Sequence, residues 1–128
     1  RAAWERGAIL AGVSAGSICW HVGGPTDSYG PDLRVITDGL GLLPYGNGVH
    51  YDSEEQRRPL LQRVVGDGLL PTSYATDDHV GILYEGDEPA RVIADQDVDP
   101  ATGPAAYRIE RVGGHVVETR LPVGEIPA

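Results

Sequence analysis

The stretch Ala8-Ile9-Leu10-Ala11-Gly12-Val13-Ser14-Ala15-Gly16 contains the pattern that decides how this chain is interpreted. Its first five residues form a short apolar run typical of a buried strand. Glycines two positions before and after Ser14 permit a sharp turn, and apolar residues then recur at helical spacing as far as about residue 22. Strand, sharp turn and helix in this order predict a nucleophile elbow, which exposes a serine hydroxyl at the start of a helix.

The remainder of the chain adds helices and then strands. We expect a helix over 1–6, mostly loop over 26–47, and a helix over 54–65 that a Ser53 and Gln56 capping box opens. Beyond Pro71 the pattern has period two, which predicts strands at 73–76, 80–84, 90–94, 106–112 and 116–121, with a two-residue hairpin turn at Gly113-Gly114. The sequence therefore predicts an α/β fold whose sheet is extended by antiparallel strands at the end.

Length and charge exclude several classes of protein. The 128 residues suit one domain, 1–128. A net charge of -9 repels phosphate backbones and anionic membrane surfaces, so neither nucleic acid nor membrane is an expected partner. No apolar run approaches membrane-spanning length, and the lone Cys19 can form no internal disulfide, so a cytoplasmic location is the default expectation. No cofactor or metal is expected.

A serine hydroxyl needs a base, a group that orients the base, and donors for the developing oxyanion. The backbone N–H of Ala15 would be one oxyanion donor. Of the four histidines, His50 follows a short strand-like run and is our candidate base. For His21, His79 and His115 a structural role is the more usual one.

The orienting acid is less well defined by the sequence. Asp27 follows the elbow helix closely and is our candidate, with competing carboxylates at Asp38, Asp52 and Glu54. Asp77 and Asp78 are interpreted as turn-forming residues.

Taken together, these segments resemble the peptidase E family of serine peptidases, which includes alpha-aspartyl dipeptidases and is related in fold to class I glutamine amidotransferases. The similarity rests on 10–20, Thr26-Asp27-Ser28, 39–43, His50-Tyr51-Asp52-Ser53-Glu54 with Arg57-Arg58-Pro59, 74–78 and 106–111. It implies Ser14 as nucleophile, His50 as base and Asp27 as the third member of the triad. It also implies that the chain corresponds to the C-terminal half of a peptidase E-like catalytic domain. The expected fold is a partial three-layer glutamine amidotransferase-like sheet, without the N-terminal βα units and the loop that supplies a second oxyanion donor.

The resemblance implies a dipeptidase-like enzyme that hydrolyses short peptides through an acyl-enzyme, with a homodimer among its expected assemblies. Family members read an acidic substrate side chain with an arginine, and the matching position here is Glu54. Arg57 or Arg58 could replace it by gripping a carboxylate, although a solvated helix face also explains both.

Three alternatives are retained. An ordinary α/β-hydrolase places its acid and base on later strands, so the short spacing from Ser14 to His50 disfavours it. A cyanophycinase-like enzyme would need several clustered arginines. From another class, the chain could be an inactive remnant, or a subunit that needs a partner chain.

Overall fold

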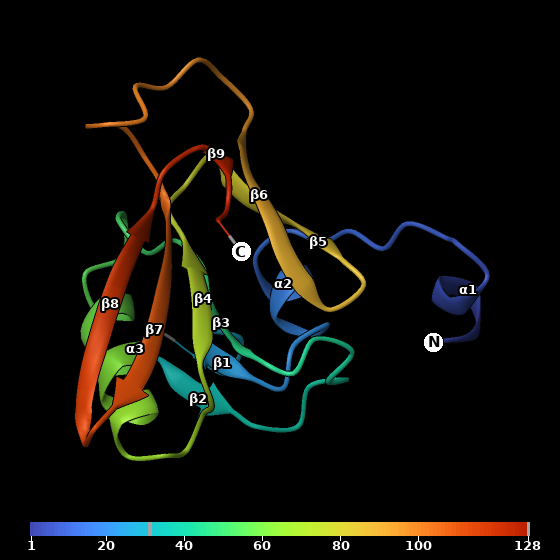
Figure 1. Ribbon diagram of the computed structural model, residues 1–128. Coiled ribbons are helices and arrows are strands. Elements are labelled where there is room, and N and C mark those ends of the chain that lie inside the picture. Colours follow the sequence, from blue (N-terminus) through green and yellow to red (C-terminus); the bar gives the residue numbers. More distant parts are fainter. Residues whose placement is uncertain (31, 128) are drawn as a thin grey trace.

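The computed structural model describes residues 1–30 and 32–127 (Figure 1). It has three helices in this part of the chain: α1 (Ala2–Glu5), α2 (Ala15–Ile18) and α3 (Arg57–Gly66). Its strands are, in chain order, β1 (Gly24–Thr26), β2 (Arg34–Ile36), β3 (Gly46–Gly48), β4 (Ser73–Thr76), β5 (Val80–Glu85), β6 (Glu88–Ala94), β7 (Ala106–Val112), β8 (His115–Leu121) and β9 (Gly124–Glu125). In the described residues, no helix is long and apolar enough to cross a membrane.

A four-stranded sheet of order β3-β4-β7-β8 forms the centre of the molecule. Strands β3 and β4 run parallel, whereas β4, β7 and β8 pair antiparallel. Helix α3 covers one face, and the small antiparallel sheet β5-β6-β9 lies against the other (Figure 1). The expected α/β class, with antiparallel strands at the end of the chain, is confirmed.

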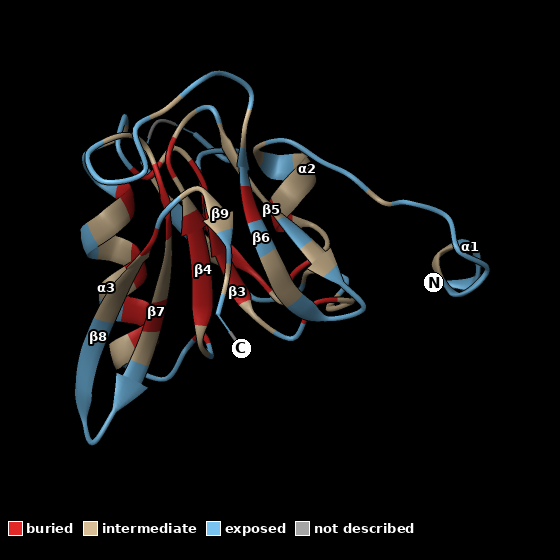
Figure 2. Ribbon diagram, turned by 45° about the horizontal axis from the view of Figure 1, so that its top comes forward, coloured by how far each residue is buried: buried red, intermediate tan, exposed pale blue. Residues whose placement is uncertain are grey.

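The alternation of side chains along the strands builds a core on each face, and the buried residues follow the central strands in Figure 2. Ala75 and Ile109 point toward α3 and are fully buried against Leu61 and Val65. A Cβ on Gly48 would lie 2.8 Å from Leu61, so a glycine here lets the helix approach the sheet closely. Helix α3 therefore packs directly against the end of β3, the strand that leads to His50.

The opposite face has its own core, formed with the three-stranded sheet. Tyr74, Ala106 and Leu121 of the central strands pack with Val92 of β6. Neighbouring residues Tyr74 and Ala75 thus face opposite sides, as the pleat of a strand requires. The second sheet is thereby held over the carboxyl end of β4, which leads directly into β5.

The sequence predicts the later elements better than the earlier ones. The strands at 73–76 and 106–112 have the expected bounds, and Gly113 and Gly114 have φ values of 57° and 83°, as a two-residue hairpin turn needs. The predicted capping box of Ser53 and Gln56 is wrong, because α3 begins only at Arg57 and no side chain caps its first turn. Starting there places Pro59 in the first turn, where its missing N–H breaks no helical hydrogen bond.

The strand expected at residues 8–12 does not form in the described chain. This segment is extended and pairs with no strand, and it leads to α1, which lies apart from the sheets (Figures 1 and 2). Ile9 is 93% exposed and Val13 85%. A strand needs a neighbour for its backbone groups, and none of the described strands lies beside this one.

Candidate active site

Ser14 lies at a strained turn directly before α2. Its φ of 57° and ψ of -121° fall in a region that a non-glycine residue rarely adopts. A Cβ on Gly12 would overlap the carbonyl oxygen of Gly16, so the close approach within this turn requires glycine at position 12. Ala15 is the first residue of α2, and its N–H is one of those that the start of a helix leaves without a helical acceptor. The sharp turn and the start of the helix expected at Ser14 are thus formed, whereas the strand expected before them is not.

His50 meets Ser14 from the other side of the site. It follows β3 and has a φ of 51°, which turns its side chain toward α2. The Oγ of Ser14 lies 3.1 Å from the Nε2 of His50. The sequence predicted these two residues as partners, and the fold brings them into hydrogen-bond contact across 36 positions of the chain.

The second imidazole nitrogen contacts Asp78. The distance from His50 Nδ1 to Asp78 Oδ1 is 2.6 Å, and both side chains are about one third exposed. An ionised carboxylate only accepts hydrogen bonds, so Nδ1 carries the proton and Nε2 is free to accept the Ser14 hydroxyl proton. Hydrogen bonds from His50 and from Ser53 hold the pKa of Asp78 below its ordinary value. Asp78 is therefore ionised at neutral pH.

Two further contacts join the loops that carry His50 and Asp78. The backbone N–H of Asp78 donates to Asp52 Oδ1 at 2.9 Å, and the N–H of Tyr51 donates to the carbonyl of Thr76 at 3.1 Å. The loop after β3 therefore contacts the loop after β4 at two points: His50 binds the Asp78 side chain, and Asp52 binds the Asp78 backbone. These contacts hold the two loops together.

The structure places Asp78, and not the predicted Asp27, against the imidazole of His50. Asp27, predicted to orient the imidazole, is 59% exposed, and its nearest ionic partner is Arg57, 3.8 Å from Oδ1 to Nη2. The signal in the sequence that would have predicted the contact between His50 and Asp78 is their position relative to two strands. His50 and Asp78 each follow one of two adjacent parallel strands by two residues, and the carboxyl ends of parallel strands meet at one edge of a sheet.

Neither arginine predicted to bind substrate lines the pocket at Ser14. Arg57 is only 2% exposed: its Nε donates to Glu54 at 2.7 Å and its Nη1 to the carbonyl of Pro25 at 2.6 Å. It ties α3 to the β1 region and is no solvated helix residue either.

Arg58 has a structural position as well. It pairs with Glu118 on β8, and its guanidinium carbon lies 4.4 Å from the ring centre of Tyr51 and 4.7 Å from that of Tyr107. Cation–π contacts and an ion pair thus occupy this side chain on the α3 side of the sheet.

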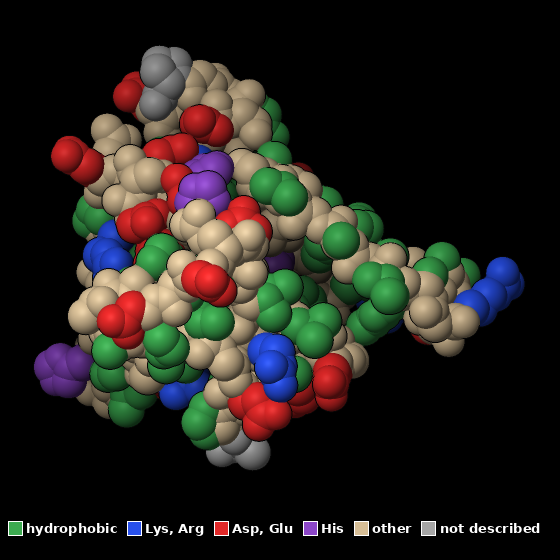
Figure 3. All heavy atoms as spheres, turned by 90° about the horizontal axis from the view of Figure 1, so that it is seen from above, with side chains coloured by type: hydrophobic (Ala, Val, Ile, Leu, Met, Phe, Trp, Pro, Cys, Tyr) green, Lys and Arg blue, Asp and Glu red, His purple; other side chains and the backbone are tan. Residues whose placement is uncertain are grey.

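A pocket of about 410 Å³ opens beside Ser14. Segment 9–14 forms one wall, and the segments 76–84 and 47–50 form much of the rest. Histidine and acidic side chains gather on the upper face of the molecule, with the apolar N-terminal arm projecting to one side (Figure 3). The volume lies within the usual range for sites that hold small ligands.

The other histidines make different contacts. His21 is buried, and burial lowers its pKa more than its bond to the carbonyl of Ser17 raises it. His79 pairs at the surface with Asp95, 3.2 Å from Nδ1 to Oδ2, and His115 is exposed at the start of β8.

Comparisons with known proteins show the family of this chain. The model of the peptidase family S51 matches residues 1–92. The chain belongs to peptidase family S51. This S51 chain is also 36% identical over 123 residues to the uncharacterized peptidase YgaJ of Bacillus subtilis (strain 168). That match covers 96% of the chain and 50% of YgaJ, so the chain spans about half the length of that relative.

No solved structure matches this chain. The resemblance to the peptidase E family is confirmed by the family match and by the relative.

Proposed function

We propose that this S51 chain is a serine-type peptidase that hydrolyses short peptides, with Ser14 as nucleophile, His50 as base and Asp78 as the group that orients the base. The observation that carries the proposal is the continuous line of hydrogen bonds Ser14 Oγ to His50 Nε2 at 3.1 Å and His50 Nδ1 to Asp78 Oδ1 at 2.6 Å. The order nucleophile, base and carboxylate is what activation of a serine hydroxyl requires.

The reaction proceeds in two stages. His50 Nε2 takes the hydroxyl proton as Ser14 Oγ attacks the peptide carbonyl, and the imidazolium then gives that proton to the leaving amine as the C–N bond breaks. Water hydrolyses the resulting Ser14 ester by the same steps in reverse. Asp78 remains ionised throughout and stabilises the imidazolium.

Ala15 is the proposed oxyanion donor within this chain. Its N–H lies at the start of α2, next to Ser14, where charge develops on the carbonyl oxygen. One such donor contributes about 10²–10³ in turnover in comparable enzymes. A second donor, supplied by another part of the protein or by a partner, would raise turnover by a comparable factor.

A fluorophosphonate probe tests the proposal because it reacts only with an activated serine. We expect it to label the chain at Ser14, and Ser14→Ala to abolish labelling and to lower any peptide turnover by about 10⁴–10⁶-fold. Ser28→Ala is the matched control, since Ser28 is exposed and bonds only Thr26 among the described residues.

The alternative of an inactive remnant, or a subunit that needs a partner chain, has support in segment 8–12, which pairs with no strand among the described residues. Soluble, folded protein that fails to react with the probe supports this alternative. Undiminished peptidase activity in Ser14→Ala contradicts the proposed nucleophile.

A further inference from the structure

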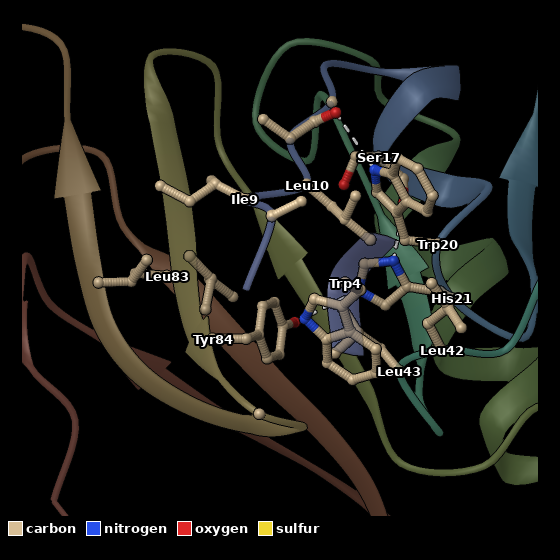
Figure 4. Close-up of a pocket in the computed structure, with 15 residues that line it drawn as sticks. Trp4, Ile9, Leu10, Ser17, Trp20, His21, Leu42, Leu43, Leu83 and Tyr84 are labelled. Carbon is tan, nitrogen blue, oxygen red and sulfur yellow. Dashed lines mark hydrogen bonds between the residues drawn. The ribbon is translucent and has the colours of Figure 1, made fainter. Parts of the chain in front are cut away.

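A second cavity of about 310 Å³, drawn in Figure 4, adjoins the pocket at Ser14 and shares lining residues with it. Both cavities are lined by Leu10, Gly12, Ser17, His21, Ile82 and Tyr84, so the two form one groove between segment 8–12 and β5. Ser17 follows Ser14 by one helical turn. The second cavity therefore begins within one helical turn of the nucleophile.

The far end of this groove is apolar. Trp4, Trp20, Leu42 and Leu43 turn toward it, with Ile82 contributed by β5 (Figure 4). The indole N–H of Trp20 donates to the carbonyl of Ala11 at 3.3 Å, which joins segment 8–12 to the turn that follows α2. In the described chain no Asp, Glu, Lys or Arg lines this second cavity.

Its two titratable groups are held uncharged. The Nδ1 of His21 lies 2.8 Å from the carbonyl of Ser17 and therefore carries a proton, which leaves Nε2 to accept the hydroxyl of Tyr84 at 3.3 Å. Burial lowers the pKa of His21 and raises the pKa of Tyr84. A charged side chain entering this cavity would lose water without gaining a counter-charge.

We propose that the cavity of Trp20, Leu42 and Leu43 is the subsite for an uncharged, apolar side chain of the peptide, adjacent to the scissile bond. This inference rests on the proposed function and names its substrate class: peptides with a leucine-like residue, and not aspartyl peptides. The two arginines that could have read a carboxylate are engaged with Glu54, Pro25 and Glu118.

Binding can be measured without catalysis because both tryptophans of the chain line this cavity. The Ser14→Ala variant is titrated with Leu-Ala, Ala-Leu, Ala-Ala and Asp-Ala while tryptophan fluorescence is recorded. We expect one of the two leucine peptides to bind at least ~10-fold more tightly than Ala-Ala, with Asp-Ala weakest, since even one methylene in an apolar pocket discriminates by about 10-fold or more. Wild-type hydrolysis should follow the same order.

Leu42→Arg places a guanidinium at the apolar end, where Leu42 is partly exposed. It should weaken binding of the preferred leucine peptide by about 10-fold and strengthen binding of Asp-Ala. Leu40→Arg is the matched control: it adds the same charge in the same loop, but Leu40 is 65% exposed and does not line the cavity. The peptide series on the parent chain decides the matter if Leu42→Arg does not fold.

The subsite is overturned if Asp-Ala binds as tightly as the leucine peptides. It is also overturned if the fluorescence titrations give the same affinity for all four peptides. Leucine-selective binding to a wild-type chain that hydrolyses none of the peptides and does not react with the probe would overturn the proposed function and leave the subsite standing. Hydrolysis of the peptides without preference for leucine would overturn the subsite and leave the proposed function standing.

Discussion

The carboxylate of Asp78 lies 2.6 Å from the Nδ1 of His50, although 28 positions separate the two residues in the chain. The contact exists because each residue follows one of the adjacent parallel strands β3 and β4, whose carboxyl ends share one edge of the sheet.

Asp78→Asn should lower turnover, or the rate of fluorophosphonate labelling if no turnover is measurable, by about 10⁴-fold. An amide in this place can donate to Nδ1, which shifts the proton to Nε2 and removes the base. Asp27→Asn is the matched control and should leave the rate within a few-fold of the parent chain, because Asp27 contacts Arg57 and not the imidazole. The opposite ranking of the two variants would restore Asp27 as the acid.

Asp52 should act as a positioning residue through Asp78. Asp52→Ala removes the acceptor of the Asp78 backbone N–H, and we expect kcat to fall by about 10-fold with KM unchanged, the equivalent of one hydrogen bond. Asp52→Asn keeps an acceptor oxygen and should restore most of the loss. A rise in KM alone, or no rescue by asparagine, would count against this role.

The two glycines of the elbow should differ in their tolerance of a side chain. Gly12→Ala places a Cβ against the carbonyl of Gly16, so the turn must shift, and a displacement of about 1 Å at Ser14 can cost about 10²-fold in labelling rate. Nothing lies within 4 Å of a Cβ at Gly16, and Gly16→Ala should label at nearly the parent rate. Equal loss in both variants would show that backbone conformation, and not close contact, explains the motif.

Arg57 should contribute to stability and not to substrate binding. Arg57→Leu leaves Glu54 and the carbonyl of Pro25 without their partner, and we expect the free energy of unfolding to fall by about 2–4 kcal/mol in urea denaturation. Arg63→Leu, on an exposed position of the same helix, should stay within about 0.5 kcal/mol. Loss of peptide binding in Arg57→Leu protein of unchanged stability would contradict this assignment.

Asp77 should make stability depend on pH. Burial raises the pKa of its carboxyl more than the bonds from Ala105 and Tyr107 lower it, and its Oδ1 has no partner among the described residues. The folded chain therefore keeps the Asp77 proton in a pH range where the unfolded chain has released it. The contribution of protonated Asp77 to the free energy of unfolding is fully present below roughly pH 4 and is lost as pH rises through the pKa of Asp77 in the folded chain. Unfolding measured against Asp77→Asn should show the parent losing stability relative to the variant as pH rises, and a relative gain would contradict the raised pKa.

The sequence by itself determined the local features of this protein: the sharp turn at Ser14, the strands at 73–76 and 106–112, and the hairpin glycines. Each depends on residues that are close in the chain, through backbone conformation, periodicity or turn chemistry. Only the tertiary structure decided which carboxylate faces His50, because Asp27 is nearer in the chain while Asp78 is brought beside it by strand pairing. It likewise decided that Arg57 is buried in ion pairs and that residues 8–12 remain unpaired, since both depend on neighbours that local patterns do not specify.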